Sequence, residues 1–422
     1  RWRHQSNAMK RTATALLLVV LVTASAVSAA GAVAATETQR SASVSGAQDG
    51  SAYAGTHVSF DVKADAVANY SIGGDTALDS VKVQSASKVD GGIGVDVDLS
   101  TVTSIRGSAL SMRASANAAA TVSTQGSASM TAHDNDHGIL VVKAGGSDQV
   151  VVANVSAGAT AESESEHQVE VTTANGTKGA FIVVGNGSVT VNEDGDVSAK
   201  LEGDSRLVFR AYPDQKTEQD EQTEDGIASG KVTGEAYVEQ QDGEMVADTV
   251  SYSENTSMTA KQSAENTVTV TVDRAREQGK IVVTSVSEAA VGTIQDIQVT
   301  VDGEAAARAS SYSELESAIG GDNSKYMVEQ SSSAEAKADV YVAVNHFSER
   351  TLQMTGSDTT QTTETGTTTA AETTAAEETT ATGTTESADG GDGGESGGGA
   401  PGFGVAVTLV GVLGAGLYAL RQ

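Results

Sequence analysis

The densest group of side chains that could do chemistry is the run His133-Asp134-Asn135-Asp136-His137. Imidazole and carboxylate groups on one loop are ligands that divalent cations accept, but zinc needs four ligands and calcium needs six or more. Asn and Asp also form turns, and this run stands between two segments with strand character. We therefore predict a structural turn whose residues His133, Asp136 and His137 can be replaced by Ala with folding intact. A metal site using His133, Asp134, Asp136 and His137 is the alternative.

Motifs of known catalytic chemistry are missing from the sequence. The other histidines of the body, His57, His167 and His346, are scattered, and no GxSxG, HExxH, Walker or dinucleotide-binding pattern occurs. The chain has no cysteine, which excludes disulfides, thiolate zinc sites and cysteine nucleophiles. We predict that the protein is not an enzyme and uses no cofactor.

Asn-x-Ser/Thr sequons offer acceptors for N-linked glycans in an exported chain. They are Asn69, Asn154, Asn175, Asn186 and Asn255. Because Ser and Thr are abundant here, chance alone produces several sequons. We expect a subset of the five to be modified.

The segments that must position these residues read as strands. Six of them alternate apolar and polar residues with a period of two, which predicts half-buried strands. These six are residues 57–67, 80–89, 92–99, 266–273, 296–302 and 337–344. Three further segments, 138–142, 180–184 and 280–283, begin with or follow a glycine and are apolar apart from Lys280. We expect those three to be central strands that are covered on both faces, or the middle of a sandwich.

These patterns predict an all-β fold, a large β-sandwich or β-solenoid-like body with one short helix. The helix is expected within residues 310–320, with Ser313 as its N-cap and Glu316 completing a capping box. A disordered stalk and a C-terminal transmembrane helix are expected to follow the body.

The body is expected to consist of two β-rich domains, residues 36–212 and residues 227–354. Between them, residues 213–226 begin with a proline and are rich in acidic side chains, with no large aliphatic residue before Ile227. Such a run is typical of a linker. We therefore predict an acidic linker at residues 213–226.

Charge restricts the partners of the chain. It carries 26 basic and 56 acidic residues, a formal net charge of −30. This charge repels phosphate backbones and excludes nucleic acid as a partner. It suits concentrated salt, where the Debye length falls to about 3 Å and self-repulsion is screened. An ordinary acidic protein of dilute medium is the alternative.

Residues 1–35 are predicted to be an N-terminal extension and a signal peptide. Lys10 and Arg11 precede an apolar stretch at residues 13–22, and Ala32-Val33-Ala34 offers an A-x-A cleavage site. The strongly apolar stretch is about ten residues long, too short to span a bilayer. We therefore expect a cleaved signal and a secreted mature chain.

The C-terminus carries Pro401-Gly402-Phe403, then an apolar run at residues 403–420, then Arg421. As a helix the run would measure about 27 Å, enough to cross a bilayer. This tail resembles the PGF-CTERM sorting signal of halophilic archaeal surface proteins, although its basic end is reduced to Arg421. The resemblance implies that Pro401, Gly402 and Phe403 are recognised by an archaeosortase, which removes the helix, and that a lipid then anchors the protein. A plain transmembrane helix is the alternative.

Residues 355–400 are rich in threonine, glycine and acidic residues and contain no large apolar residue. Such a segment cannot bury enough surface to offset the entropy of ordering, so we expect a disordered, O-glycosylated stalk.

Together these features predict an exported, acidic cell-surface glycoprotein with a structural, adhesive or protective role in the cell envelope, associated with the surface layer. The first alternative is a surface-displayed solute- or metal-binding module that uses the loop at residues 133–137. A tethered hydrolase of unrecognised type is the second.

Overall fold

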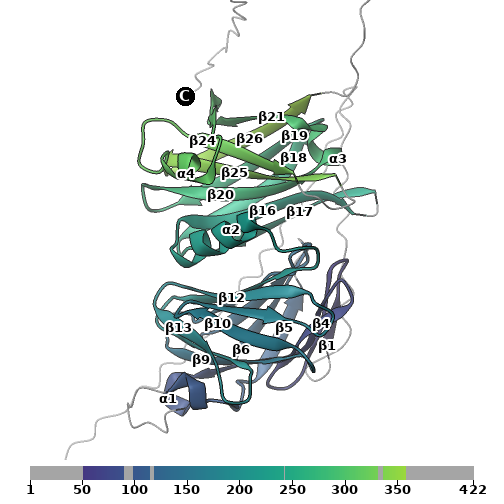
Figure 1. Ribbon diagram of the computed structural model, residues 1–422, viewed down its shortest axis with the longest axis vertical. Coiled ribbons are helices and arrows are strands. Elements are labelled where there is room, and N and C mark those ends of the chain that lie inside the picture. Colours follow the sequence, from purple (N-terminus) through teal and green to yellow (C-terminus); the bar gives the residue numbers. More distant parts are fainter. Residues whose placement is uncertain (1–50, 90–97, 115–117, 242, 331–335, 358–422) are drawn as a thin grey trace, which may run out of the picture. The chain divides into compact units, whose positions relative to one another are not determined.

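The computed structural model describes residues 51–89, 98–114, 118–241, 243–330 and 336–357 (Figure 1). Most of these residues lie in β-strands, as the alternating patterns predict. The predicted signal peptide, nearly all of the predicted stalk and the predicted sorting signal fall outside them. The described chain forms two β-sandwiches, which we call the first lobe (residues 51–212) and the second lobe (residues 232–357).

The first lobe contains two antiparallel sheets, A and B. Sheet A has the order β1-β2-β3-β4-β9-β14-β13, and sheet B has the order β10-β11-β12-β15-β8-β7-β6-β5. The strands of sheet A are β1 Ser51–Ala54, β2 Val58–Val62, β3 Val67–Ile72, β4 Asp75–Ser85, β9 Gln149–Val155, β13 Gly187–Val191 and β14 Val197–Leu201. Those of sheet B are β5 Leu110–Ala114, β6 Ala119–Thr124, β7 Ser129–His133, β8 Leu140–Lys143, β10 Thr160–Ser165, β11 Gln168–Thr172, β12 Lys178–Val184 and β15 Arg206–Tyr212.

The second lobe contains sheets C and D. Sheet C has the order β17-β16-β20-β25-β24-β23, in which β16 pairs with β20 and β23 with β24 in parallel; sheet D has the order β18-β19-β26-β21-β22. The strands of sheet C are β16 Val232–Gln241, β17 Glu244–Ser251, β20 Gln278–Ser287, β23 Ala307–Arg308, β24 Lys325–Gln330 and β25 Lys337–His346. Those of sheet D are β18 Thr256–Ala264, β19 Thr267–Arg274, β21 Thr293–Val301, β22 Glu304–Ala305 and β26 Glu349–Ser357.

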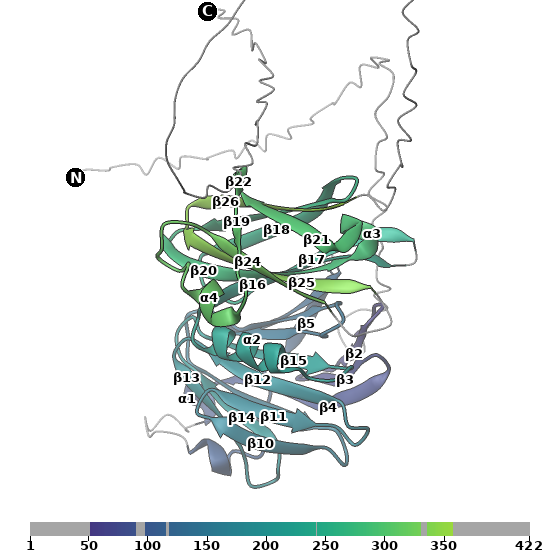
Figure 2. The same cartoon turned by 45° about the horizontal axis from the view of Figure 1, so that its top comes forward.

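Each lobe has an apolar core between its two sheets, as strand alternation requires. In the first lobe the core includes Tyr70 and Leu78 of sheet A and Phe181 and Phe209 of sheet B. The core of the second lobe is built mainly from valines, together with Leu352 and Met354 of β26. Figures 1 and 2 show the paired sheets of each lobe.

A third apolar cluster joins the outer face of sheet B to the outer face of sheet C. In β8, Leu140 and Val142 point into the core of the first lobe, whereas Val141 belongs to this third cluster. Ile182 and Ile281, in the two other wholly apolar segments, also belong to it and are fully buried. The prediction that these three segments are covered on both faces is therefore confirmed.

The expectation of a single helix is wrong, because the described residues contain four α-helices. They are α1 Ala86–Val89, α2 Glu218–Ala228, α3 Glu288–Val291 and α4 Tyr312–Glu316. The predicted strand at residues 80–89 therefore ends in α1, and β4 stops at Ser85.

The segment expected to be an acidic linker instead forms most of α2, which contacts both β12 and β16. Thr217 and Asp220 form a capping box, and the acidic residues of the first turn suit the positive end of the helix dipole. The sequence pattern did not indicate the helix, because its buried face includes the polar residues Thr223 and Glu224. In the structure these two side chains are hydrogen-bonded to Tyr341 and Lys216.

Two further boundaries differ from the sequence expectations. In α4 the N-cap is Ser311, not Ser313, and its hydroxyl accepts a hydrogen bond from Glu314 N–H at 3.2 Å. Ser311 has extended backbone angles, which places its side chain at the helix start. The stalk was expected to begin at residue 355, but Thr355 still belongs to β26. It pairs there with Thr267 of the neighbouring strand β19.

Candidate functional site

The loop at residues 133–137 reverses the chain between β7 and β8, as predicted. Gly138 N–H donates to the Asn135 carbonyl at 2.9 Å, and Gly138 has a φ of 49°, a left-handed conformation that glycine tolerates best. The loop is nevertheless not an exposed turn, because His133, Asp134 and Asn135 are all buried. Its polar groups must therefore find partners inside the protein.

Asp134 binds the turn between β1 and β2. Its carboxylate accepts hydrogen bonds from the backbone N–H groups of Thr56, His57 and Val58, each at 2.8 Å. Gly55 passes so close that a β-carbon there would lie 2.1 Å from Asp134 Oδ2. The side chain of Asp134 thus holds a neighbouring turn of the first lobe and has little room for a metal ion.

His133 and Asn135 reach the second lobe and hold the same carboxylate. His133 Nδ1 lies 3.0 Å from Asp248 Oδ1, and Asn135 Nδ2 donates to Asp248 Oδ2 at 2.9 Å. Asp248 lies on β17 and is buried. Both oxygens of one carboxylate in the second lobe are therefore engaged by the loop of the first.

The last two residues of the loop add to this contact. His137 Nδ1 donates to the Ala211 carbonyl at 3.0 Å, and its ring packs edge-on against Tyr212 and Tyr237. Asp136 Oδ2 accepts from Lys337 Nζ of β25 at 3.3 Å. The four residues of the alternative metal site thus diverge toward different partners.

Among the described residues, no group of three or more His, Cys, Asp or Glu side chains is arranged to hold a metal ion. We also expected that His133, Asp136 and His137 could be replaced with folding intact. Their contacts with Asp248, Lys337 and the Ala211 carbonyl argue against that expectation. A pattern of turn-forming residues does not show that their side chains contact the other lobe. The loop therefore has a larger structural role than its sequence predicts.

Strand β16 presents a row of polar residues to the first lobe. Glu239 accepts from Lys337 Nζ at 2.7 Å and lies 3.2 Å from His57 Nε2. Burial opposes the ionisation of Glu239, but the nearby His57 imidazole and the Lys337 ammonium outweigh this and lower the pKa of Glu239 to about 2. Gln241, two residues further on, accepts from the Thr56 hydroxyl at 3.1 Å.

Arg210 of β15 is the buried cation at the other end of this row. Its guanidinium nitrogens lie 3.5 Å from Glu235 of β16 and 3.5 Å from Asp220 of α2. The hydroxyls of Tyr237 and Tyr252 both donate to Glu235. Burial alone would lower the pKa of Arg210, but the charge of Glu235 reverses this and raises it, so Arg210 stays charged between the lobes.

Helix α2 closes the same interface through a third set of contacts. Lys216 Nζ bonds Glu170 of β11 and Glu224 of α2, each at 3.0 Å, and Glu224 also accepts from the Tyr212 hydroxyl. Buried, mutually bonded charges of this kind fix geometry, and removing one partner leaves the charge of the other uncompensated.

We call the contacts of residues 133–137, Arg210, Glu235, Glu239, Asp248 and Lys337 the interlobe network.

The sequence contained a signal for the interlobe network, but an ambiguous one. Glu235, Tyr237, Glu239 and Gln241 share one face of β16, and alternating apolar residues occupy the other. Such alternation is normally interpreted as a core face and a solvent face. Here the polar face is covered by the first lobe.

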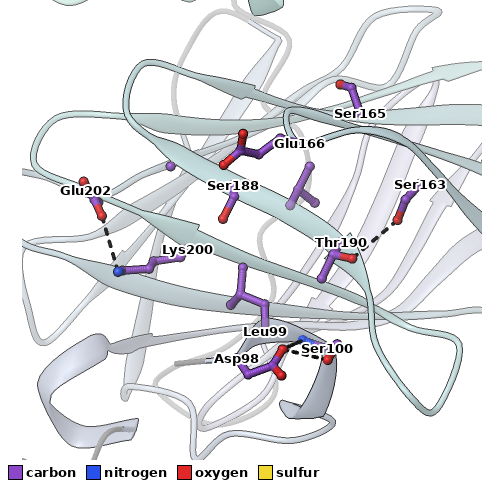
Figure 3. Close-up of a pocket in the computed structure, with 12 residues that line it drawn as sticks. Asp98, Leu99, Ser100, Ser163, Ser165, Glu166, Ser188, Thr190, Lys200 and Glu202 are labelled. Atoms are coloured by element: carbon purple, nitrogen blue, oxygen red, sulfur yellow. Dashed lines mark hydrogen bonds and ion pairs between the residues drawn. The ribbon is translucent and has the colours of Figure 1, made fainter. Parts of the chain in front are cut away.

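A polar groove opens on the first lobe where β10, β13, β14 and η1 (Leu99–Thr101) meet (Figure 3). Its volume is about 620 Å³. Hydroxyl and charged side chains dominate its walls, among them Ser163, Ser188, Lys200 and Glu202. Lys200 Nζ lies 3.3 Å from Glu202 Oε1, so this cation is paired. No motif in the sequence indicated the groove.

The structure places four of the predicted sequons, Asn69, Asn175, Asn186 and Asn255, at exposed positions. Asn154 differs, because it is partly buried within β9 and both its amide nitrogen and its amide oxygen are hydrogen-bonded. Its Nδ2 donates to Asp196, and its Oδ1 accepts from the Ser80 hydroxyl at 2.8 Å. A glycan on Asn154 would require this strand to open.

None of the helices in the described ranges has the length and apolar character needed to cross a bilayer. The predicted helix at residues 403–420 and the motif residues Pro401, Gly402 and Phe403 lie outside those ranges.

Comparison with known proteins locates the anchoring signal. Residues 400–422 match the PGF-CTERM motif. No curated protein sequence matches the chain. A crystal structure of an active YidC insertase with its first transmembrane domain resolved aligns over 41% of each chain, with 9% identity and a TM-score of 0.22. A TM-score this low does not indicate a shared fold.

The described fold is that of a two-lobed β-sandwich protein whose interface combines an apolar cluster with buried, paired polar groups. Its C-terminal motif marks it as a surface protein that is processed by an archaeosortase and anchored at its C-terminus.

Proposed function

We propose that the protein is a non-enzymatic envelope glycoprotein whose two lobes act as one rigid structural unit in a protective layer at the cell surface. The interlobe network is the observation that carries this proposal. His133, Asn135, Arg210 and Lys337 bind carboxylates across the interface, Lys337 through Asp136, and the third apolar cluster lies beside them.

Rigidity is useful to a structural protein for a physical reason. Lobes joined by a flexible linker move independently, whereas lobes that share a buried apolar cluster and paired charges resist bending. The interface groups are engaged with one another, which supports a structural role for them. The acidic composition and the exposed sequons support a hydrated, glycosylated outer surface.

The first test asks whether the lobes behave as one unit. In calorimetry, the anchored protein released in detergent should unfold both lobes in one cooperative transition. The double variant Arg210→Ala/Asp248→Ala should split this transition in two, because each lobe keeps its own core. Two separate transitions in the unaltered protein would contradict the proposal.

The second test is made in cells. A strain that lacks the protein should lyse more readily on osmotic downshift than the parent strain. The double variant, displayed at equal surface abundance, should restore resistance poorly, whereas Asp194→Ala, at an exposed turn, should restore it fully. Full rescue by the double variant would show that interlobe rigidity is not what the envelope requires.

A further inference from the structure

The polar groove of the first lobe lies between two sheet edges. Strand β13 is the last strand of sheet A, and β10 is the first strand of sheet B. Two contacts bridge these edges: Val189 N–H donates to the Glu166 carbonyl at 2.9 Å, and Val191 N–H donates to the Ser163 hydroxyl at 3.1 Å. Edge strands are sites of unwanted pairing with other chains, and native proteins cover or charge them.

The groove contains part of a glycosylation sequon. Gly187 and Ser188, the second and third residues of the Asn186 sequon, both line it, and Figure 3 shows Ser188 in the groove near Glu166 and Lys200. Asn186 itself is exposed in the turn between β12 and β13. Its carbonyl accepts from Glu202 N–H at 3.0 Å, which fixes the turn beside another groove residue.

We propose that an N-linked glycan on Asn186 lies in this groove and covers the edges β10 and β13. The proposal rests on the proposed glycoprotein nature of the chain and assigns a structural role to one sequon. The volume of about 620 Å³ lies within the range of ordinary ligand sites and suits a short oligosaccharide. The occupant is tethered by its attachment, so weak contacts suffice to keep it in place.

The groove chemistry matches a neutral sugar. Hydroxyl and carboxylate side chains such as Ser163, Ser188 and Glu166 can exchange hydrogen bonds with sugar hydroxyls. Glu166, Glu202 and Asp98 at the walls disfavour an acidic ligand. Aromatic side chains do not line the groove, which argues against a flat apolar ligand.

Asn175 provides a matched comparison. It is an exposed sequon of the same lobe, and its Nδ2 donates to Asp75 at 2.8 Å, but neither it nor its two following residues line the groove. A glycan on Asn175 is therefore expected to project into solvent. Comparing the two sites therefore distinguishes the effect of a glycan that lies in the groove from the effect of glycosylation elsewhere on the lobe.

The test uses full-length protein from the native host, as wild type, Asn186→Gln and Asn175→Gln. Glycopeptide mass spectrometry gives the occupancy of each sequon, and hydrogen–deuterium exchange follows β10 and β13. Asn186→Gln should speed exchange in both strands by roughly threefold or more, because the bridged edges open more readily when no glycan lies over them. Asn175→Gln should leave it unchanged. Wild-type chain made in a host without glycosylation, checked for folding by circular dichroism, should behave as Asn186→Gln does.

An unmodified Asn186 in protein whose other sequons carry glycans would overturn this inference and leave the glycoprotein assignment standing. An occupied Asn186 whose removal leaves exchange in β10 and β13 unchanged would also overturn it. If no sequon is modified, both this inference and the glycoprotein assignment fail. Faster exchange in the absence of the glycan that is reversed by a high concentration of added free oligosaccharide would support the seating, because the sugar would then protect the same strands without its attachment.

Discussion

His133 and Asp248, which are 115 positions apart in the sequence, meet at 3.0 Å in a buried contact between the two lobes. Asn135 donates to the second oxygen of the same carboxylate. The loop at residues 133–137, whose sequence is typical of a turn, thus supplies a partner for each oxygen of the Asp248 carboxylate in the second lobe.

Replacing Asp248 by Ala should lower the free energy of unfolding by about 3 kcal/mol, because His133 and Asn135 would be left buried without their acceptor. Urea unfolding followed by circular dichroism measures this loss. Asp194→Ala, at an exposed turn, is the control and should change stability by less than about 0.5 kcal/mol. An equal response of the two variants would show that the contact does not stabilise the fold.

Asp339 of β25 should make stability depend on pH. Burial raises the pKa of Asp339 from 3.8 to about 6; the charges of His137 and Arg210 oppose this rise, and that of Asp136 adds to it. Because the folded pKa exceeds the unfolded one, protonation favours the folded state, and its stabilising effect is lost as the pH rises from about 4 to about 6.

The variant Asp339→Asn removes that titration. Its unfolding free energy minus that of the wild type should therefore increase from about pH 4 to about pH 6 and stay level above. Urea unfolding at a series of pH values measures this difference, and the exposed Asp194→Asn serves as the control. Parallel stability curves for wild type and Asp339→Asn would refute the assignment.

Gly55→Ala should destabilise the first lobe by about 2 kcal/mol, because its β-carbon would lie 2.1 Å from the Asp134 carboxylate that holds the β1–β2 turn. Gly126→Ala is the matched control, since its β-carbon would meet Thr124 Oγ1 at an ordinary 3.5 Å. Thermal melting distinguishes the two. A Gly55→Ala protein as stable as the Gly126→Ala protein would mean that Asp134 can move away without loss.

Transfer from molar salt to dilute buffer should destabilise the body, because a net charge of −30 then repels itself unscreened. Circular dichroism and melting across a salt series measure the effect. A melting temperature that stays constant down to about 10 mM salt would rule out salt dependence.

Archaeosortase processing should remove the helix after Pro401. Peptide mapping of the mature protein from native membranes should therefore recover no peptide from residues 408–421. Recovery of that peptide at the abundance of body peptides would point to an intact transmembrane anchor.

The sequence by itself determined the strand-rich fold and the anchoring signal. Period-two alternation depends on local backbone geometry, so strands such as β19 and β25 were predicted within a few residues. The wholly apolar segments revealed strands covered on both faces, because a strand that buries both faces cannot alternate. The PGF-CTERM motif is contiguous, and it could be found without any fold.

Only the tertiary structure decided which polar residues work together. Glu239 and Lys337 belong to different strands, and their contact at 2.7 Å depends on how β16 and β25 are placed in sheet C, with β20 between them. Helix α2 was hidden because its buried face includes Thr223 and Glu224, and the hydroxyl of Thr223 donates to Tyr341 of β25, which no local sequence pattern predicts. Alternation shows that a face is polar, but whether water or another lobe covers that face is decided by long-range packing.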